Sequence, residues 1–197
     1  GRWFPDAALN TCHNAVDRHV AAGRGQQDAI IYDSPMTGQV QRITYAALQN
    51  RVAKLAGALA ARGIGKGDRV VIYMPMVPEA AIAMLATARL GAVHSVVFGG
   101  FAAAELASRI ADAKPKAIIS ASCGLEPGRV VKYKPLLDEA IALSPHKPSS
   151  VLILQRSQAP CELTPGRDED LLAVEEAAAP HGCVSVAATD PLYILYT

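Results

Sequence analysis

The chain has 197 residues, of which 51% are hydrophobic and 19% are charged. This composition excludes a largely disordered chain, because the apolar surface is sufficient to offset the entropy lost on folding. A net charge of +1, from 19 Lys and Arg against 18 Asp and Glu, argues against a nucleic-acid partner, and no apolar run reaches the ~18 residues that a membrane span needs.

The N-terminal segment, residues 1–43, is irregular at its start. A helix is expected over residues 10–22, with Gly23 as its stop signal. Two short apolar runs then flank a turn-forming stretch, so residues 29–32 and 39–44 are predicted to pair as a β-hairpin.

From Thr44 onward, helices and strands are predicted to alternate. Thr44 can cap a helix at its N-terminus, and Gly63 can end that helix in the left-handed conformation with Ile64 folding back onto it. Helices are expected over 45–62, 78–90, 102–113, 135–143 and 171–178; strands are expected over 69–73, 93–98, 117–121, 151–155 and 192–196, and loops over 122–133 and 158–170.

The predicted strands are continuous Val and Ile runs rather than alternating ones, which is typical of a parallel sheet buried on both faces. The sequence therefore predicts an α/β fold. A doubly wound, mostly parallel sheet with helices on both faces should occupy residues 44–197, preceded by the short irregular and hairpin segment of residues 1–43.

Two glycine-containing segments follow predicted strands, where ligands bind in open α/β sheets. Phe98-Gly99-Gly100-Phe101 lies between a strand and a helix, so its backbone can approach a ligand closely; the alternative is a tight turn chosen for packing. In Gly124-Leu125-Glu126-Pro127-Gly128-Arg129, a stiff turn presents a guanidinium suited to phosphate; the alternative is a solvated basic loop.

No catalytic or metal centre is evident from spacing. The cysteines at 12, 123, 161 and 183 form no Cys-x-x-Cys motif, which suits a reducing compartment and argues against a disulfide framework or a zinc site. The histidines stand at no metal-ligand spacing, and Gly-x-Ser-x-Gly and His-Glu-x-x-His are both absent. The sequence therefore predicts no catalytic residue and no metal ligand within the chain.

Taken together, these segments resemble the N-terminal part of the AMP-forming short-chain acyl-CoA synthetases, in the propionyl- and acetyl-CoA synthetase branch of the adenylate-forming enzymes. The matching stretches are Arg2-Trp3-Phe4, Leu9-Asn10, Asn14-Ala15-Val16-Asp17-Arg18-His19, Thr44-Tyr45, Gly65-Lys66-Gly67-Asp68-Arg69-Val70, Tyr73-Met74-Pro75-Met76, Gly91-Ala92-Val93-His94-Ser95-Val96-Val97-Phe98-Gly99-Gly100-Phe101 and Asp190-Pro191-Leu192-Tyr193-Ile194-Leu195-Tyr196-Thr197.

The resemblance implies a ligase that converts propionate or acetate, ATP and CoA into acyl-CoA, AMP and pyrophosphate. The Gly-Leu-Glu-Pro-Gly-Arg loop is similar to that of the propionate-preferring group. Tyr196-Thr197 resemble the first two residues of the family's phosphate loop. The resemblance thus places the ATP and Mg²⁺ site, the acyl pocket and the catalytic lysine outside this chain, which is expected to be inactive alone.

For CoA, the resemblance assigns Gly100 to the nucleotide pocket and Glu126, Pro127, Gly128 and Arg129 to the 3′-phosphoadenosine. The acetyl branch carries arginine at both ends of the second loop, whereas this chain has Glu126 at the first end. Arg129 is then the single guanidinium of this loop available to the phosphate, so weaker or altered CoA binding is expected.

Two other interpretations remain. The chain is alternatively a truncated, non-catalytic interaction module that self-associates through an apolar face. A nucleotide-binding oxidoreductase half ranks last, because Gly-x-Gly-x-x-Gly is absent. Alanine enrichment without a visible transit peptide favours a bacterial cytoplasm, with the mitochondrial matrix as the alternative.

Overall fold

The structure is a computed structural model that describes residues 4–196, so Arg2, Trp3 and Thr197 of the quoted motifs lie outside the described residues. Its centre is a six-stranded sheet in which every neighbouring pair is parallel. The strands are β4 (Arg69–Met74), β5 (Val93–Phe98), β6 (Ala117–Ala121), β9 (Ser150–Leu154), β10 (Asp168–Asp170) and β12 (Tyr193–Ile194), in the order β10-β9-β6-β4-β5-β12.

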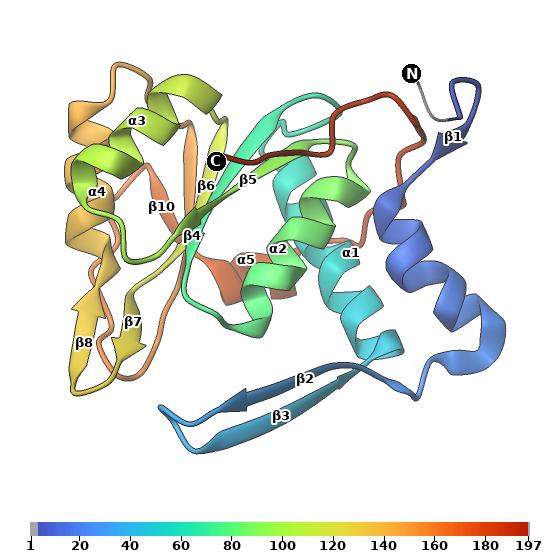
Figure 1. Cartoon of the computed structure of the whole chain (residues 1–197), viewed down its shortest axis with the longest axis horizontal. Coiled ribbons are helices and arrows are strands. Elements are labelled where there is room, and N and C mark those ends of the chain that lie inside the picture. Colours follow the sequence, from blue (N-terminus) through green and yellow to red (C-terminus); the bar gives the residue numbers. More distant parts are fainter. Residues whose placement is uncertain (1–3, 197) are drawn as a thin grey trace.

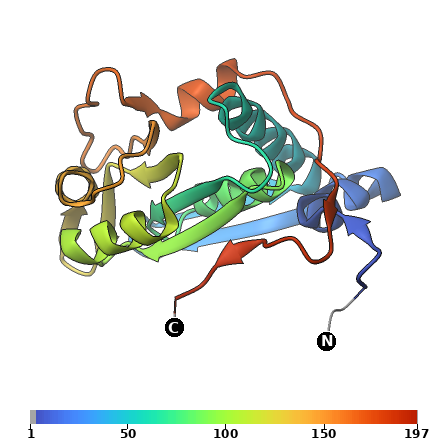
Figure 2. The ribbon, with the colours of Figure 1, turned by 90° about the horizontal axis from the view of Figure 1, so that it is seen from above.

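Helices cover both faces of this sheet (Figures 1 and 2). Three of them pack with one set of strand residues, and the other two pack with the alternate set. The first group comprises α1 (Tyr45–Ala61), α2 (Pro78–Arg89) and α5 (Leu171–Ala177), and the second comprises α3 (Ala103–Ala113) and α4 (Tyr133–Leu143). The predicted doubly wound α/β fold is confirmed.

Strand β4 shows why the strand sequences are continuously apolar. Val70 and Ile72 belong to the core under α1 and α2, whereas Val71 and Tyr73 belong to the core under α3 and α4. All four side chains are fully buried, because successive residues of a strand point to opposite faces.

The predicted ends of α1 are also confirmed. The Thr44 hydroxyl accepts a hydrogen bond from the Ala47 amide at 3.3 Å. Gly63 adopts φ +75°, and the Ile64 amide donates to the Leu59 carbonyl at 3.2 Å. This reverse turn satisfies carbonyls that the helix end leaves without partners.

The N-terminal segment contains the predicted helix and hairpin, with differences in detail. Strands β2 (Asp28–Ser34) and β3 (Gln39–Thr44) pair antiparallel. The helical part includes two π-helical stretches, η1 (His13–Asp17) and η2 (Val20–Arg24), and Gly23 has the left-handed φ of +78° expected of a stop signal.

The prediction of loops over residues 122–133 and 158–170 was wrong in part. The first contains a hairpin, β7 (Cys123–Glu126) and β8 (Arg129–Lys132), joined by Pro127-Gly128. The second ends in strand β10 (Asp168–Asp170), beside β9. These strands are too short to carry a periodic signal, and pairing with a distant partner decides them.

A further short pair joins segments near the two ends of the chain. Strand β1 (Ala8–Leu9) pairs antiparallel with β11 (Val186–Ala187). The expected boundary at residue 43 stays a prediction; Cys12, Val16 and Ile43 belong to the same core cluster as α1. Among the described residues, no helix has both the length and the apolar character needed to cross a membrane.

Asp168 provides a pH-dependent test of this fold. Its side chain is fully buried and contacts Arg167 at 2.5 Å and Lys134 at 3.0 Å. Burial alone would raise its pKa, but hydrogen bonds from Arg167, the Thr164 amide and Lys134 outweigh burial and lower the pKa to about 2.

Because the pKa of the folded chain lies below that of the unfolded chain, ionised Asp168 stabilises the fold above about pH 4, and this contribution is lost as the pH falls towards 2. We expect the free energy of unfolding, measured by urea titration, to fall by about 2 kcal/mol more between pH 4 and 2 in the native chain than in Asp168→Asn. The exposed Asp6→Asn should retain the native slope, and parallel slopes for the native chain and Asp168→Asn would contradict the assignment.

Candidate functional site

A cavity of about 390 Å³ lies at the carboxyl ends of β4 and β5. After β4 the chain enters α2 on one face of the sheet, and after β5 it enters α3 on the other face. The two connections therefore diverge, which opens a crevice where open α/β sheets bind their ligands. Residues 74–77 at the end of β4 and just after it, and residues 96–100 at the end of β5 and just after it, line the cavity, together with residues 33–36 at the end of β2 and in the β2–β3 turn.

Tyr73, in the neighbouring strand β4, holds the glycine turn after β5 in place. The Phe101 amide donates to the Phe98 carbonyl at 3.1 Å, which closes the turn. The Tyr73 hydroxyl shares its single proton between the Phe101 carbonyl at 3.0 Å and the Gly99 carbonyl at 3.3 Å. Burial raises the pKa of Tyr73 to about 12, so the hydroxyl keeps the proton with which it anchors the turn.

Tyr133, the first residue of α4, explains two of the glycines. A Cβ atom at Gly99 would lie 2.1 Å from the Tyr133 hydroxyl oxygen, and one at Gly124 would lie 2.5 Å from it. The Tyr133 ring also packs against Tyr73, with ring centroids 4.9 Å apart. Tyr133 therefore joins the turn after β5 to the β7–β8 hairpin, and a close approach requires glycine at both positions.

Gly100 is different from Gly99. A Cβ atom there would meet the ring of Phe98 at 2.6 Å, but Phe98 is 70% exposed and its ring can turn away. Packing therefore requires glycine less strongly at position 100 than at position 99.

The structure brings only part of the predicted CoA site into the cavity. Gly100 and Glu126 line it, whereas Pro127, Gly128 and Arg129 form the adjoining hairpin turn outside the lining. Arg129 is occupied by an ion pair with Glu126 at 2.7 Å. Because these side chains are 69% and 41% exposed, the pair is weak and a phosphate can compete for Arg129.

Sequence reasoning missed three contributors to the cavity: Tyr133, Arg156 and the β2–β3 turn. Arg156 follows β9 and donates to the Cys123 carbonyl at 3.1 Å. Its place after the carboxyl end of a strand was a usable signal. Nothing in the sequence indicates that the β2–β3 turn, far away along the chain, reaches the same cavity.

A larger cavity of about 540 Å³ lies beside the start of α4 and is lined by Lys132, Lys134 and Asp138. Lys134 is buried and its ammonium is bound by Asp138 at 2.5 Å and Asp168 at 3.0 Å. Its charge is therefore compensated within the fold, and this cavity is a weaker candidate for an anionic ligand.

One group of side chains among residues 4–196 comes close enough together to be considered for a metal ion. The ligand atoms of Cys12, Asp17 and Cys183 lie within 4.8 Å of one another. Sequence spacing predicted no such group, because Cys183 lies at the opposite end of the chain. Arg89 is bound to the same carboxylate at 2.7 Å and supplies the positive charge there.

Residues 17–197 match the sequence profile of the family described as AMP-binding enzyme, so the chain belongs to that family. Its relatives include short-chain acyl-CoA and acetyl-CoA synthetases, as the resemblance in the sequence indicated. The human mitochondrial protein named acyl-CoA synthetase short-chain family member 3 is 52% identical over 197 residues, which cover 100% of this chain and 29% of the relative.

Two further relatives support this assignment. An acetyl-coenzyme A synthetase of Xanthobacter autotrophicus is 46% identical over 201 residues, covering 100% of this chain and 30% of that protein. The solved acetoacetyl-CoA synthetase from Streptomyces lividans superposes with a TM-score of 0.87 at 28% identity, covering 100% of this chain and 29% of that one. The chain therefore spans about three tenths of the length of these relatives.

The contact between Gly99 and Tyr133 predicts that alanine destabilises the fold at position 99 but not at a glycine without such a neighbour. Gly99→Ala should lower the midpoint of thermal unfolding and alter the near-ultraviolet circular dichroism of the tyrosines, because the new methyl group overlaps the Tyr133 ring. Gly65→Ala is the matched control, since nothing lies within 4 Å of its Cβ position and its φ is not left-handed. In a Tyr133→Ala background, Gly99→Ala should cost less; an unchanged cost would refute the contact.

Proposed function

We propose that the chain is the N-terminal part of an ATP-dependent, AMP-forming short-chain acyl-CoA ligase and supplies part of its CoA site. The main support is the cavity at the divergence of β4 and β5, with the glycine turn in its lining and Arg129 on the adjoining hairpin. Membership of the AMP-binding enzyme family supports the reaction class.

The proposed reaction has two steps. A carboxylate oxygen attacks the α-phosphate of ATP, which forms an acyl-adenylate and releases pyrophosphate. The CoA thiol then attacks the acyl carbon, which forms the thioester and releases AMP. The binding sites for ATP, Mg²⁺ and the acyl group are assigned to parts of the enzyme outside this chain, so the chain alone should show no ligase activity.

CoA combines a long, largely neutral arm with an anionic nucleotide, and the site offers a counterpart to each. The cavity lining is mainly apolar side chains and backbone, with Asp33, Glu126 and Arg156 among its charged groups. We assign the 3′-phosphate to Arg129, which stands on a turn that Pro127 stiffens and in which Gly128 adopts the left-handed φ of +76°. Glu126 competes with the phosphate for that guanidinium.

The acyl substrate and the compartment are finer proposals. Propionate is favoured over acetate by the Gly-Leu-Glu-Pro-Gly-Arg loop at residues 124–129, and competition between the two acids in the complete ligase would decide. A bacterial cytoplasm is favoured by composition, with the mitochondrial matrix as the alternative; the relatives include a bacterial protein and a mitochondrial one.

Calorimetric titration of the chain with CoA and with 3′-dephospho-CoA tests the site. Arg129→Ala should weaken CoA binding about tenfold, the effect of one charge-assisted contact, and leave 3′-dephospho-CoA unaffected. Glu126→Ala should strengthen CoA binding, because it frees Arg129. The matched control is Arg42→Ala, which removes another exposed, ion-paired arginine; equal CoA affinities for the native chain and Arg129→Ala would remove Arg129 from the site.

A second function, self-association as an interaction module, is favoured by exposed apolar side chains at one edge of the sheet. Val96 and Phe98 of β5 are 46% and 70% exposed, and Leu195, just after β12, is 71% exposed. Such a surface stabilises contacts between copies of the chain.

If self-association is the function, sedimentation velocity should show a fraction of dimer that rises with the concentration of the chain. The double variant Phe98→Ser, Leu195→Ser should then be monomeric. Val40→Ser, which alters another exposed apolar residue, in the β2–β3 hairpin, should have no such effect. A monomer at all concentrations would eliminate this second function.

A further inference from the structure

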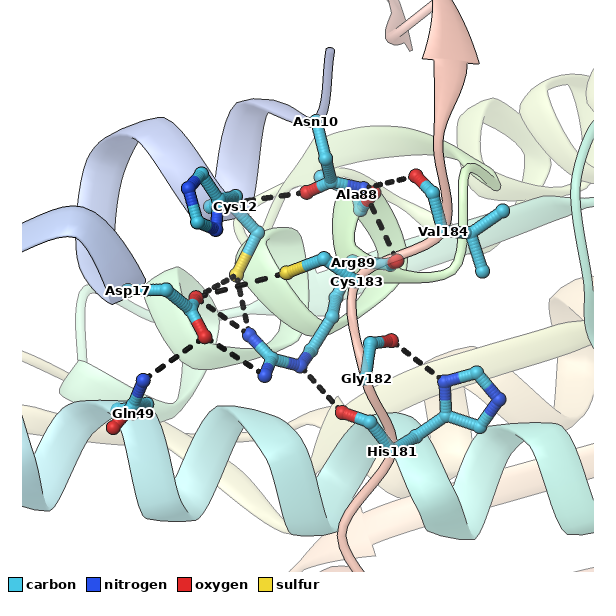
Figure 3. A network of polar contacts seen from close by, with 11 residues as sticks. Asn10, Cys12, Asp17, Gln49, Ala88, Arg89, His181, Gly182, Cys183 and Val184 are labelled. Atoms are coloured by element: carbon cyan, nitrogen blue, oxygen red, sulfur yellow. Dashed lines mark hydrogen bonds and ion pairs between the residues drawn. The ribbon is translucent and has the colours of Figure 1, made fainter. Parts of the chain in front are cut away.

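Two cysteine thiols from opposite ends of the chain lie side by side at the end of α2 (Figure 3). Cys12 immediately precedes η1 and is fully buried. Cys183 is partly exposed and lies in a stretch that is neither helix nor strand. Both thiols point to the same carboxylate oxygen, Asp17 Oδ2, at 4.0 Å from Cys12 Sγ and 3.6 Å from Cys183 Sγ.

Asn10 holds the two backbone segments in this arrangement. Its buried side-chain amide donates to the Val184 carbonyl at 2.8 Å and to the Ala88 carbonyl at 2.9 Å. The Val184 amide in turn donates to the Arg89 carbonyl at 2.8 Å. The residues next to both cysteines are therefore fixed against the end of α2, so the proximity of the thiols is built into the fold.

The charges around the thiols disfavour a metal ion. Asp17 already accepts two hydrogen bonds from Arg89, at 2.7 and 3.0 Å, and one from Gln49 at 2.9 Å. Arg89 also donates to Cys12 Sγ at 3.4 Å. A divalent cation would have to displace a guanidinium that compensates the partly buried carboxylate, whereas a bond between the sulfurs leaves that ion pair intact.

We propose that Cys12 and Cys183 are a redox-active pair that hydrogen peroxide converts into a disulfide joining the N-terminal segment to the segment before β11. The two sulfurs, at most 4.8 Å apart, have to approach to about 2.05 Å. The partly exposed Cys183 side chain can supply this movement by rotating about its Cα–Cβ bond while the neighbouring backbone stays in place.

The chemistry balances with the peroxide as oxidant. The partly exposed Cys183 sulfur attacks one peroxide oxygen, the O–O bond breaks, and water leaves as the sulfur becomes a sulfenic acid. The Cys12 sulfur then attacks the Cys183 sulfur, the S–O bond breaks, and a second water leaves with the remaining thiol proton. Two thiols and one peroxide thus give one disulfide and two waters.

The surroundings of the two thiols make their oxidation slow at neutral pH. Burial raises the pKa of Cys12, and burial likewise raises the pKa of Cys183, to about 12, although Arg89 opposes both shifts. Because the thiolate is the reactive form, sustained oxidant is needed. Once formed, the bond closes a loop that includes most of the chain, and this should stabilise the fold.

The test is oxidation of the chain with hydrogen peroxide, followed by peptide mass mapping without reductant. We expect a linked Cys12–Cys183 peptide whose mass is lower by two hydrogen atoms and which dithiothreitol separates. The midpoint of thermal unfolding should rise by roughly 5–15 °C on oxidation and return on reduction.

Cys183→Ser should abolish both the linked peptide and the rise, and its partly exposed position makes it tolerant of the change. Cys161→Ser, which removes another partly exposed thiol, should leave both unchanged. Four free thiols after oxidation, or sulfinic acid on Cys183 without a linked peptide, would overturn the proposal. So would retention of one equivalent of Zn²⁺ that is lost in Cys12→Ala and Cys183→Ser, because the pair would then be a metal site.

Discussion

The sheet of this protein has to be covered on both of its faces, because each of its central strands presents apolar side chains in both directions. Val70 and Val71 are equally buried, although they belong to different cores. The chain meets this constraint by sending α2 and α3 to opposite sides after neighbouring strands. The crevice at the carboxyl ends of β4 and β5 is a direct consequence, so the candidate site exists because of how the core is buried.

Two tyrosines turn this crevice into a defined surface. Tyr73 holds the carbonyls of the glycine turn from within the sheet, and Tyr133 fills the space that Gly99 and Gly124 leave open. The hairpin that carries Arg129 is thereby tied to the turn that carries Gly100. Neither tyrosine is among the residues predicted to contact CoA. Their role in holding the site together is therefore not evident from the predicted CoA-binding residues.

Segments near the two ends of the described chain meet at a polar cluster as well as in the apolar core that Cys12 and Cys183 contact. Asn10 and Arg89 are both buried, and between them they bind the end of α2, the N-terminal segment and the stretch around Cys183. Such groups are stable in the interior only when each is fully partnered. The same requirement that orders these segments also brings two thiols together.

Local structure and the fold class could be predicted from the residues alone. Periodicity and stop signals located α1, its Thr44 cap and its Gly63 end, since these depend on neighbours a few residues away, and the continuous apolar strands indicated a parallel sheet. Motif resemblance indicated the family. Four features emerge only when the chain is folded: the β7–β8 hairpin, the ion pair between Arg129 and Glu126, the position of Arg156 in the cavity lining and the proximity of Cys12 to Cys183. Each of these depends on groups brought together through space, where packing and charge compensation act without any trace in local spacing.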